Sequence, residues 1–167
     1  MDLRAVQKPL KDEYRRDPAA SRITLAARGA QRDTPVACSV DLGRAIYEAQ
    51  AHQGVGGAGS AACSGDLLLG ALAACAQITC QMVATSMGIE TERIEVTVEG
   101  DLDLRGTLAV DRDVPAGFEV IRVRFDVDAP GTSADDLDSL ISKTERYCTV
   151  LQSLREPSPV VTERAPA

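Results

Sequence analysis

The sequence predicts a single α+β domain, and three observations lead to this prediction. Two segments, residues 64–87 and 134–154, have the apolar spacing of buried or half-buried helices. Several shorter segments carry the β-branched, alternating pattern of strands. No stretch of the 167 residues repeats another or resembles a linker, and the length suits one domain. We therefore expect one domain over residues 1–167, divided into an N-terminal extension (1–20), a core (21–155) and a C-terminal tail (156–167).

The N-terminal part is expected to be mostly short strands. A short helix is predicted from Leu10 to Arg16, within the polar extension. The following strands are predicted at residues 23–27, 35–40 and, more weakly, 44–49, with a polar turn at 28–33. The glycine-rich segment 54–62 has neither the Gly-Lys-Ser/Thr ending of a phosphate loop nor the pattern of a dinucleotide site. We interpret it as a mobile loop over a pocket or an interface.

The central helix is predicted to begin near Ser64 and to end at Gly88. Ser64 suits the N-cap, and Asp66 in the first turn suits the positive end of the helix dipole. Apolar residues occur almost all round this helix, which indicates burial on most sides. The stretch 67–89 is long enough for a membrane span. However, it contains several polar residues and lacks basic or aromatic anchors, so we interpret it as a buried core helix and expect no membrane partner.

The second half of the chain is expected to be a meander followed by a helix. The strands are predicted at residues 93–103, 106–111 and 120–128. The last one alternates strictly, with four apolar residues facing in: Ile121, Val123, Phe125 and Val127. The helix, about 134–154, begins at Ser133 as N-cap with Asp136 three residues later. Cys148 lies on its apolar stripe and is therefore expected to face the core.

Composition and charge exclude several classes of function. The net charge of −7 disfavours nucleic acid and anionic membranes as partners. The five cysteines, without a signal-peptide pattern at the N-terminus, indicate free thiols in a reducing, cytoplasmic compartment. No Cys-x-x-Cys occurs and His52 is the only histidine, so we expect no metal site. The sequence also contains no nucleophile-elbow motif that could pair with His52, which disfavours a Cys-His hydrolase.

Cys75 is the first candidate for thiol chemistry. Small residues surround it in sequence and leave room beside the sulfur for a partner element or a small pocket. The plain alternative is a buried cysteine that acts as a small hydrophobic residue. Cys80 lies five residues further on, about 140° away around the helix, so the two cannot easily form a disulfide.

Four sequence blocks carry a resemblance to a known family. They are Asp66–Cys75, Gly100–Gly106, Pro115–Arg122 and Glu145–Val150. In this order and spacing they resemble the OsmC/Ohr superfamily, the osmotically inducible and organic hydroperoxide resistance proteins, over about residues 20–155. The stretches Ala62–Asp66 and Thr144–Cys148 are more similar to an OsmC-like branch than to the organic hydroperoxide resistance branch proper.

The resemblance implies an assembly and an activity. The assembly is an intertwined homodimer in which antiparallel sheets wrap two central helices. The activity is reduction of organic hydroperoxides, and of hydrogen peroxide as a second substrate, without a cofactor. Cys75 would attack the O–O bond and become a sulfenic acid, Cys148 would resolve it as a disulfide, and a thiol or dithiol would be the reductant.

The residues that would favour ionisation of Cys75 match the pattern of the family less well than the two cysteines do. The family uses an arginine from the N-terminal strands and, in one branch, a glutamate ten residues before the first cysteine. Here that position is Gly65, with Asp66 next to it. Arg28, Arg32 and Arg44 are the candidate arginines, and Arg44 is favoured because it borders a strand that could enter the interface. Glu145, close to Cys148, is a further supporting candidate.

Two alternatives stay open at this point. The missing glutamate favours a non-catalytic OsmC-like protein that binds a small apolar ligand or a partner. A purely structural dimer with inert thiols is the other. Retention of both cysteines at the family's positions favours the peroxidase. The sequence assigns no role to Cys38, Cys63 or Cys80.

Overall fold

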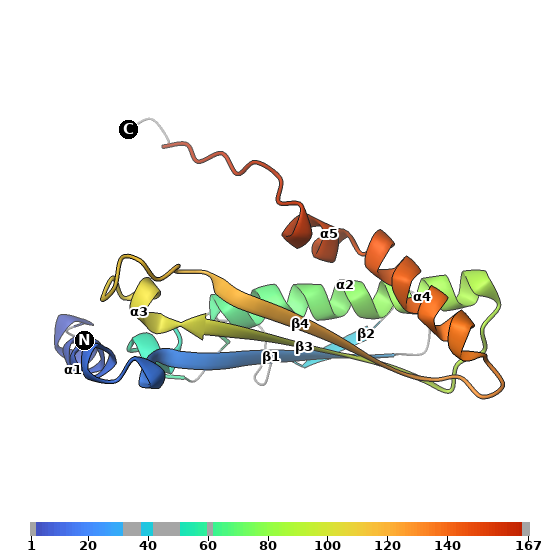
Figure 1. Cartoon of the computed structure of the whole chain (residues 1–167), viewed down its shortest axis with the longest axis horizontal. Helices are drawn as coiled ribbons and strands as arrows, with labels where there is room; N and C mark the ends of the chain where they lie inside the picture. Colours follow the sequence, from blue (N-terminus) through green and yellow to red (C-terminus); the bar gives the residue numbers. More distant parts are fainter. Residues whose placement is uncertain (1–2, 32–37, 42–50, 60–61, 165–167) are drawn as a thin grey trace.

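The sheet is antiparallel and has four strands. The computed structural model describes residues 3–31, 38–41, 51–59 and 62–164. Its strands, in the spatial order β2-β1-β3-β4, are β1 (Arg22–Gln31), β2 (Cys38–Asp41), β3 (Arg93–Asp103) and β4 (Phe118–Asp128). Together with the helices they confirm the predicted α+β class (Figure 1).

One long helix lies along the sheet. α2 (Ser64–Met87) packs on β1 and β3, and α4 (Ala134–Tyr147) and α5 (Thr149–Arg155) pack in turn on α2 (Figure 1). The remaining helices are α1 (Leu3–Arg16), the four-residue α3 (Leu104–Thr107), and the 3-10 turns η1 (Pro18–Ser21) and η2 (Gln53–Val55). α1 thus contains the predicted helix 10–16 and extends it toward the N-terminus.

The core lies between α2 and the sheet. Leu69, Leu72 and Ala76 of α2 pack with Val96 and Val98 of β3, and all five are completely buried. β3 alternates in burial along its length. β4 alternates between half-buried and exposed residues from Ile121 onward, which confirms the predicted pattern. The charged residues of β4 form ion pairs on the outer face, such as Arg122 with Asp101 at 2.7 Å.

Part of the apolar surface of α2 is exposed in the part of the chain that the structure describes. Leu67 and Leu68 are each 39% exposed and Met82 is 51% exposed. The prediction of burial on most sides is therefore wrong for the single chain. By length and composition, α2 could also cross a membrane, but half of its most apolar window is buried inside the protein, as in the core helix of a soluble protein.

The start of α2 differs from the prediction by one residue. Cys63, with φ −85° and ψ 169°, is the N-cap, and Ser64 is the first helical residue. The Asp66 carboxylate accepts a hydrogen bond from the backbone N–H of Cys63 at 2.7 Å. Gly88 ends the helix in the left-handed conformation, at φ 69°, as expected.

The strand expected at 106–111 is absent, because the chain turns there. The carboxylate of Asp103 accepts the backbone N–H of Arg105 at 3.0 Å and thereby caps α3. A Cβ on Gly106 would lie 2.3 Å from the carbonyl oxygen of Pro115, so this position requires glycine and a compact turn. The polar turn expected at 28–33 is also wrong in part, because residues 28–31 continue β1, where Arg28 pairs with Thr97. The strand expected at 44–49 lies outside the described residues.

The second predicted helix is two helices. α4 ends at Tyr147 and α5 begins at Thr149, with Cys148 between them at φ −72° and ψ 104°. The backbone N–H of Cys148 still donates to the carbonyl of Thr144 at 2.9 Å, and its own carbonyl accepts from Gln152 at 2.9 Å. The break is thus a single extended residue, and it changes the direction of the chain at the cysteine (Figure 1).

The glycine-rich segment begins in the short 3-10 turn η2. η2 lies against α1, where the Tyr14 hydroxyl donates to the carbonyl of Gly54 at 2.8 Å and the Gln7 amide donates to that of Val55 at 3.1 Å. A Cβ on Gly54 would lie 2.3 Å from a methyl carbon of Leu104. These contacts attach the start of the segment to the N-terminal helix, while residues 60–61 lie outside the described residues.

Candidate active site

Cys75 and Cys148 meet in the main core of the protein. Cys75 lies in the middle of α2 and is half-buried, whereas Cys148, at the joint between α4 and α5, is completely buried. Both belong to the cluster that contains Leu72 and Leu151. Cys148 therefore faces the core, as predicted. The described cysteines with defined side chains, Cys63, Cys75, Cys80 and Cys148, are all free thiols.

The two thiols interact with each other. Burial raises the pKa of Cys148 to about 11, partly opposed by the backbone N–H of Leu151, and a side-chain hydrogen bond with Cys75 raises the pKa further. Cys148 thus stays protonated at neutral pH. A protonated thiol is a poor nucleophile, and Cys148 is also the more deeply buried of the two, so the two cysteines are not equivalent.

A small hollow adjoins the hydrophobic cluster that contains the two thiols, on the side of the sheet. It measures about 330 Å³ and lies between the first half of β4 and α5. Its apolar wall includes Leu72, Ile121 and Leu151, which links it to the cluster around both thiols. Glu145 and Arg155 stand at its polar side and form an ion pair at 3.3 Å.

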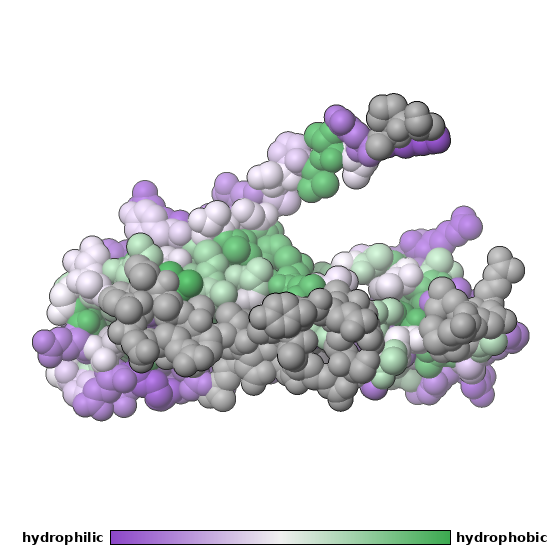
Figure 2. Space-filling view, turned by 180° about the vertical axis from the view of Figure 1, so that it is seen from behind, coloured by the Kyte–Doolittle hydropathy of each residue, from purple (hydrophilic) through white to green (hydrophobic). Residues whose placement is uncertain are grey.

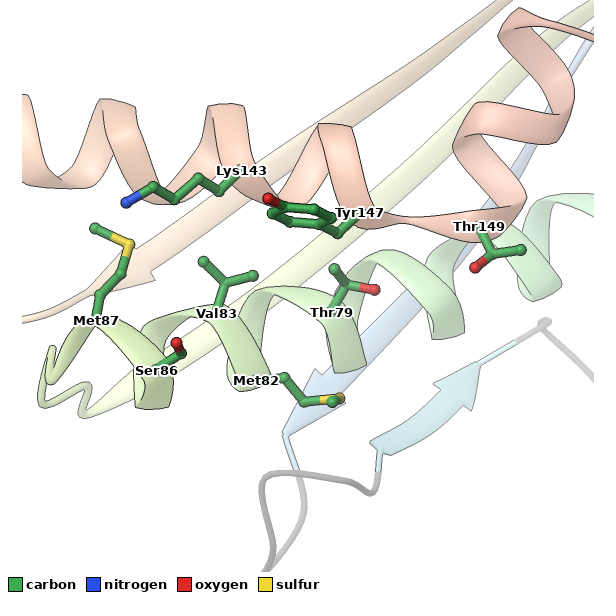
Figure 3. A pocket seen from close by; sticks show the side chains of 8 residues that line it. All are labelled: Thr79, Met82, Val83, Ser86, Met87, Lys143, Tyr147 and Thr149. Carbon is green, nitrogen blue, oxygen red and sulfur yellow. The ribbon is translucent and has the colours of Figure 1, made fainter.

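A larger groove runs along the other side of α2. It measures about 960 Å³ and is lined by Thr79, Met82, Val83, Ser86, Met87, Lys143, Tyr147 and Thr149 (Figure 3). Lys143 extends toward Met87 at one end, and Thr149 stands at the other. Thr149 directly follows Cys148, and Thr79 is one helical turn beyond Cys75. The thiols themselves do not line the groove, but one of its ends is formed by residues close to both of them in sequence.

The predicted supporting residues are placed differently. Asp66 caps α2 about 13 Å along the helix from Cys75, nine residues away and half a turn round, so the structure does not bring the two together. Glu145 lies one turn before Cys148 and is held by Arg155 and by the Gln152 amide, which donates to its backbone carbonyl at 2.7 Å. Arg32 and Arg44 lie outside the described residues, and Arg28 is placed by its backbone on β1.

A buried amide pair that was not predicted from the sequence lies close to the site. Gln77 is completely buried, and its amide donates to Gln81 at 2.7 Å and to the backbone carbonyl of Ile94 at 2.9 Å. These bonds attach α2 to β3 two residues after Cys75. The four-residue spacing of two glutamines in an apolar helix was the signal that could have shown this pair.

A second buried contact holds α4 against α2. Cys80 is completely buried, and burial raises the pKa of its thiol, against a hydrogen bond with Thr144. The Thr144 hydroxyl also donates to the carbonyl of Leu140 at 2.8 Å. Cys80 and Thr144 therefore have a structural role in the packing of α4 on α2. They set the position of α4, and hence of Cys148, relative to α2.

The fold and the site together define a class: an α+β protein that holds two free thiols in contact, one on its long central helix and one at a helix joint. The profile of the OsmC-like proteins matches residues 57–163, and the chain belongs to this family. No curated protein matches the chain in sequence.

Among solved structures, an OsmC-like hydroperoxide resistance protein from Jannaschia sp. CCS1, a crystal structure at 1.70 Å resolution, is similar in fold. The TM-score is 0.62 at 13% identity, over 88% of this chain and 95% of that one. At this identity the likeness concerns the fold alone. The resemblance noted in the sequence is thus confirmed at the level of the family.

Proposed function

We propose that the protein is a thiol-dependent peroxidase that reduces organic hydroperoxides, and hydrogen peroxide less efficiently. The observation that carries the proposal is the contact between Cys75 and Cys148, one half-buried and the other completely buried with its pKa raised to about 11. A peroxidase of this kind needs one thiol that meets the peroxide and a second that need only reach the oxidised sulfur. Membership of the OsmC-like family supports a peroxide-related role.

The roles follow from accessibility and protonation. Cys75 is the thiol that substrate can reach, so it is the nucleophile. Its thiolate attacks one oxygen of the O–O bond, the alcohol leaves with a proton, and Cys75 becomes a sulfenic acid. Cys148 then attacks the oxidised sulfur, and its proton leaves with the hydroxyl group as water. The resulting disulfide persists until an external thiol or dithiol reduces it with two electrons.

Ionisation of Cys75 requires a nearby positive charge, because burial by itself disfavours a thiolate. We assign this role to an arginine of the N-terminal strands, with Arg44 the first candidate. Glu145 supports the site by holding Arg155 at the hollow beside Cys148. A disulfide cycle with an external reductant also suits a cytoplasmic location, where thiols are kept reduced.

We further propose that the protein works as a homodimer. The exposed face of α2 is the reason, because Leu68, Met82 and the neighbouring Tyr147 of α4 are 39%, 51% and 60% exposed. Figure 2 shows apolar surface gathered in the middle of one face of the molecule, beneath the C-terminal segment. A second copy that packs on this face would bury it and enclose Cys75.

The dimer is testable by a charge placed on this face. Wild type is expected to sediment as a dimer at micromolar concentration, and Leu68→Asp/Met82→Asp as a monomer, because two carboxylates would have to be buried at the interface. Ala116→Asp, on an exposed loop, adds charge without touching α2 and should leave the dimer intact. A folded wild-type monomer at this concentration, measured by light scattering, would contradict the proposal.

The pairing of the thiols is tested by mapping disulfides after oxidation. One equivalent of cumene hydroperoxide is expected to produce a Cys75–Cys148 disulfide and to leave Cys38, Cys63 and Cys80 reduced. We expect this pair because Cys148 is the thiol that already interacts with Cys75 in the reduced protein. Peptides from alkylated protein, with unreacted enzyme as reference, identify the bond. A dominant bond between any other pair would mean that the resolving role belongs elsewhere.

A further inference from the structure

The joint between α4 and α5 interrupts a helix that its residues would allow to continue. The apolar spacing of residues 134–154 runs through the joint, and this stretch contains neither proline nor glycine. Cys148, with ψ 104°, leaves the helical conformation, and α5 then takes a different direction from α4 (Figure 1). A sharp bend in a helix has an identifiable cause, such as a proline or a side chain that enters the hydrogen-bond ladder. Because proline is absent here, a side chain is the expected cause.

The break takes the helical donor away from one backbone carbonyl of α4. In a continuous helix the carbonyl of Glu145 would accept from the backbone N–H of Thr149, four residues later. The extended ψ of Cys148 turns that N–H out of the ladder. The side-chain amide of Gln152 takes its place and donates to the Glu145 carbonyl at 2.7 Å. The backbone N–H of Gln152 also donates to the carbonyl of Cys148 at 2.9 Å, so one residue binds on both sides of the break.

A second contact crosses the joint, but it contributes less. Arg155 of α5 forms its ion pair with the Glu145 carboxylate of α4 at 3.3 Å. The two side chains are 52% and 40% exposed, so water and salt screen this pair. The bond from the Gln152 amide is partly buried, and a carbonyl left without a donor there is costly. Gln152 is therefore the main contact that stabilises the break.

We propose that Gln152 is a positioning residue of the thiol site, because its side-chain amide holds the break that keeps Cys148 in place to resolve the oxidised Cys75. Cys148 is the extended residue of the break and packs in the cluster that also contacts Cys75. In the resolution step the Cys148 sulfur bonds to the Cys75 sulfur and the S–O bond of the sulfenic acid breaks. The hydroxyl group leaves as water with the Cys148 proton. This inference rests on the proposed peroxidase function.

The resolution step should be sensitive to small movements of the joint. The two sulfurs must approach to about 2 Å before the disulfide forms. A misplacement of about 1 Å can cost about 100-fold in the rate of such a step. The first oxidation involves Cys75 alone, on α2, and should not depend on the joint. A positioning role therefore predicts a change in one rate and not in the other.

The kinetic test compares two substitutions of Gln152. Gln152→Met removes the donor and keeps the length of the side chain. After one equivalent of cumene hydroperoxide it should form the disulfide roughly tenfold or more slowly than wild type, with an unchanged first oxidation. Gln152→Lys should resolve at close to the wild-type rate, because its ammonium can also donate to a carbonyl at a helix C-terminus. Samples quenched over time with dimedone, which labels sulfenic acid, separate the two steps by mass spectrometry.

The matched control removes the same kind of hydrogen bond elsewhere. The Gln7 amide donates to the backbone carbonyl of Val55 at 3.1 Å, between α1 and η2. Gln7→Met should leave both steps unchanged. Resolution at the wild-type rate in Gln152→Met would overturn the positioning role, and so would an equal slowing of resolution in Gln7→Met. Gln152→Ala tests the same loss of the donor with a residue that favours helix, should Gln152→Met not fold.

A redox equilibrium provides a second measurement that needs no peroxide. In mixtures of reduced and oxidised dithiothreitol, Gln152→Met should form the Cys75–Cys148 disulfide with an equilibrium constant roughly tenfold or more below that of wild type, because Cys148 is no longer held beside Cys75. Gln152→Lys should stay close to wild type. If hydroperoxide produces no sulfenic acid in wild type and the equilibrium still depends on Gln152, the peroxidase proposal fails and the positioning role stands. If wild type resolves its sulfenic acid and neither the rate nor the equilibrium depends on Gln152, the positioning role fails and the peroxidase stands.

Discussion

Replacing Cys75 by serine is expected to lower hydroperoxide turnover by roughly 10³-fold or more, the scale of loss when an enzyme's nucleophile is removed. A serine hydroxyl does not ionise at neutral pH and does not attack the O–O bond. Consumption of cumene hydroperoxide, followed by stopped flow with a dithiol reductant, measures the loss. Cys63→Ser is the matched control. It makes the same change at the N-cap of α2, where serine is a preferred residue, and should keep turnover close to wild type.

Cys148→Ser is expected to behave differently from Cys75→Ser. Its first oxidation should proceed, because Cys75 still meets the peroxide, and turnover should then stop at the sulfenic acid or continue to sulfinic acid. Mass spectrometry of the oxidised protein distinguishes these products by one oxygen atom.

The substrate profile belongs to the same experiment. Leu72, Ile121 and Leu151 form an apolar wall close to the thiols, so alkyl hydroperoxides should react faster than hydrogen peroxide. Each buried methylene contributes about 0.8 kcal/mol, and two of them exceed a tenfold preference. If wild type and Cys75→Ser consume alkyl hydroperoxide at the same slow rate, the enzyme proposal fails, and a ligand-binding OsmC-like protein becomes the better interpretation.

Replacing Asp103 by asparagine is expected to cost about 3 kcal/mol of unfolding free energy, as for the loss of one partner from a buried ion pair. The Asp103 side chain is completely buried, and the Arg105 guanidinium binds it through two nitrogens, at 2.6 Å from Nη2 and 3.0 Å from Nε to Oδ2. The Ser21 hydroxyl donates to its other oxygen. Asparagine has one acceptor oxygen in place of two and no charge, so the buried ion pair is lost and Arg105 is left with its longer pair to Asp111, at 3.6 Å.

The same carboxylate should make stability depend on pH. The hydrogen bonds from Arg105 hold the pKa of Asp103 well below its ordinary value, against the effect of burial. A depressed pKa in the folded state means that the stabilisation is complete above the unfolded pKa of about 3.9 and is lost as the pH falls below it. Urea unfolding at pH 7 and pH 3 should therefore show a smaller fall in stability for Asp103→Asn than for wild type.

Asp101 provides the control on the same strand. It also pairs with an arginine, Arg122 at 2.7 Å, and its pKa is lowered to about 2, but this ion pair is exposed to solvent. Because water and salt screen exposed pairs, Asp101→Asn should destabilise far less than Asp103→Asn. Equal losses at both positions would show that burial of the carboxylate is not what matters.

Local patterns in the sequence determined much of the fold. α2 runs from Ser64 to Met87 because an uncharged, mainly apolar stretch lies between an N-terminal acid and Gly88. β3 matches its predicted bounds, and β4 its predicted end and its alternation, because one face of each strand packs on the core while the other carries charges. The motifs around Cys75 and Cys148 also sufficed to identify the family. Periodicity, capping and spacing are local properties, and the sequence shows them directly.

Only the tertiary structure determined how these elements contact one another and where the chain turns between them. The apolar spacing of residues 134–154 continues across Cys148, yet the chain breaks there, and the break places the buried thiol against Cys75. Residues 106–111 are compatible with a strand, but the Asp103 cap and the close approach of Gly106 to Pro115 turn the chain. Asp66 lies next to the position of the family's activating acid, but its carboxylate accepts a hydrogen bond from the backbone N–H of Cys63, the N-cap of α2. At Asp66 the competing hydrogen-bond partner is local, three residues earlier. At Cys148 and Gly106 a contact that forms only in the folded chain outweighs the local preference, and no local pattern in the sequence contains that information.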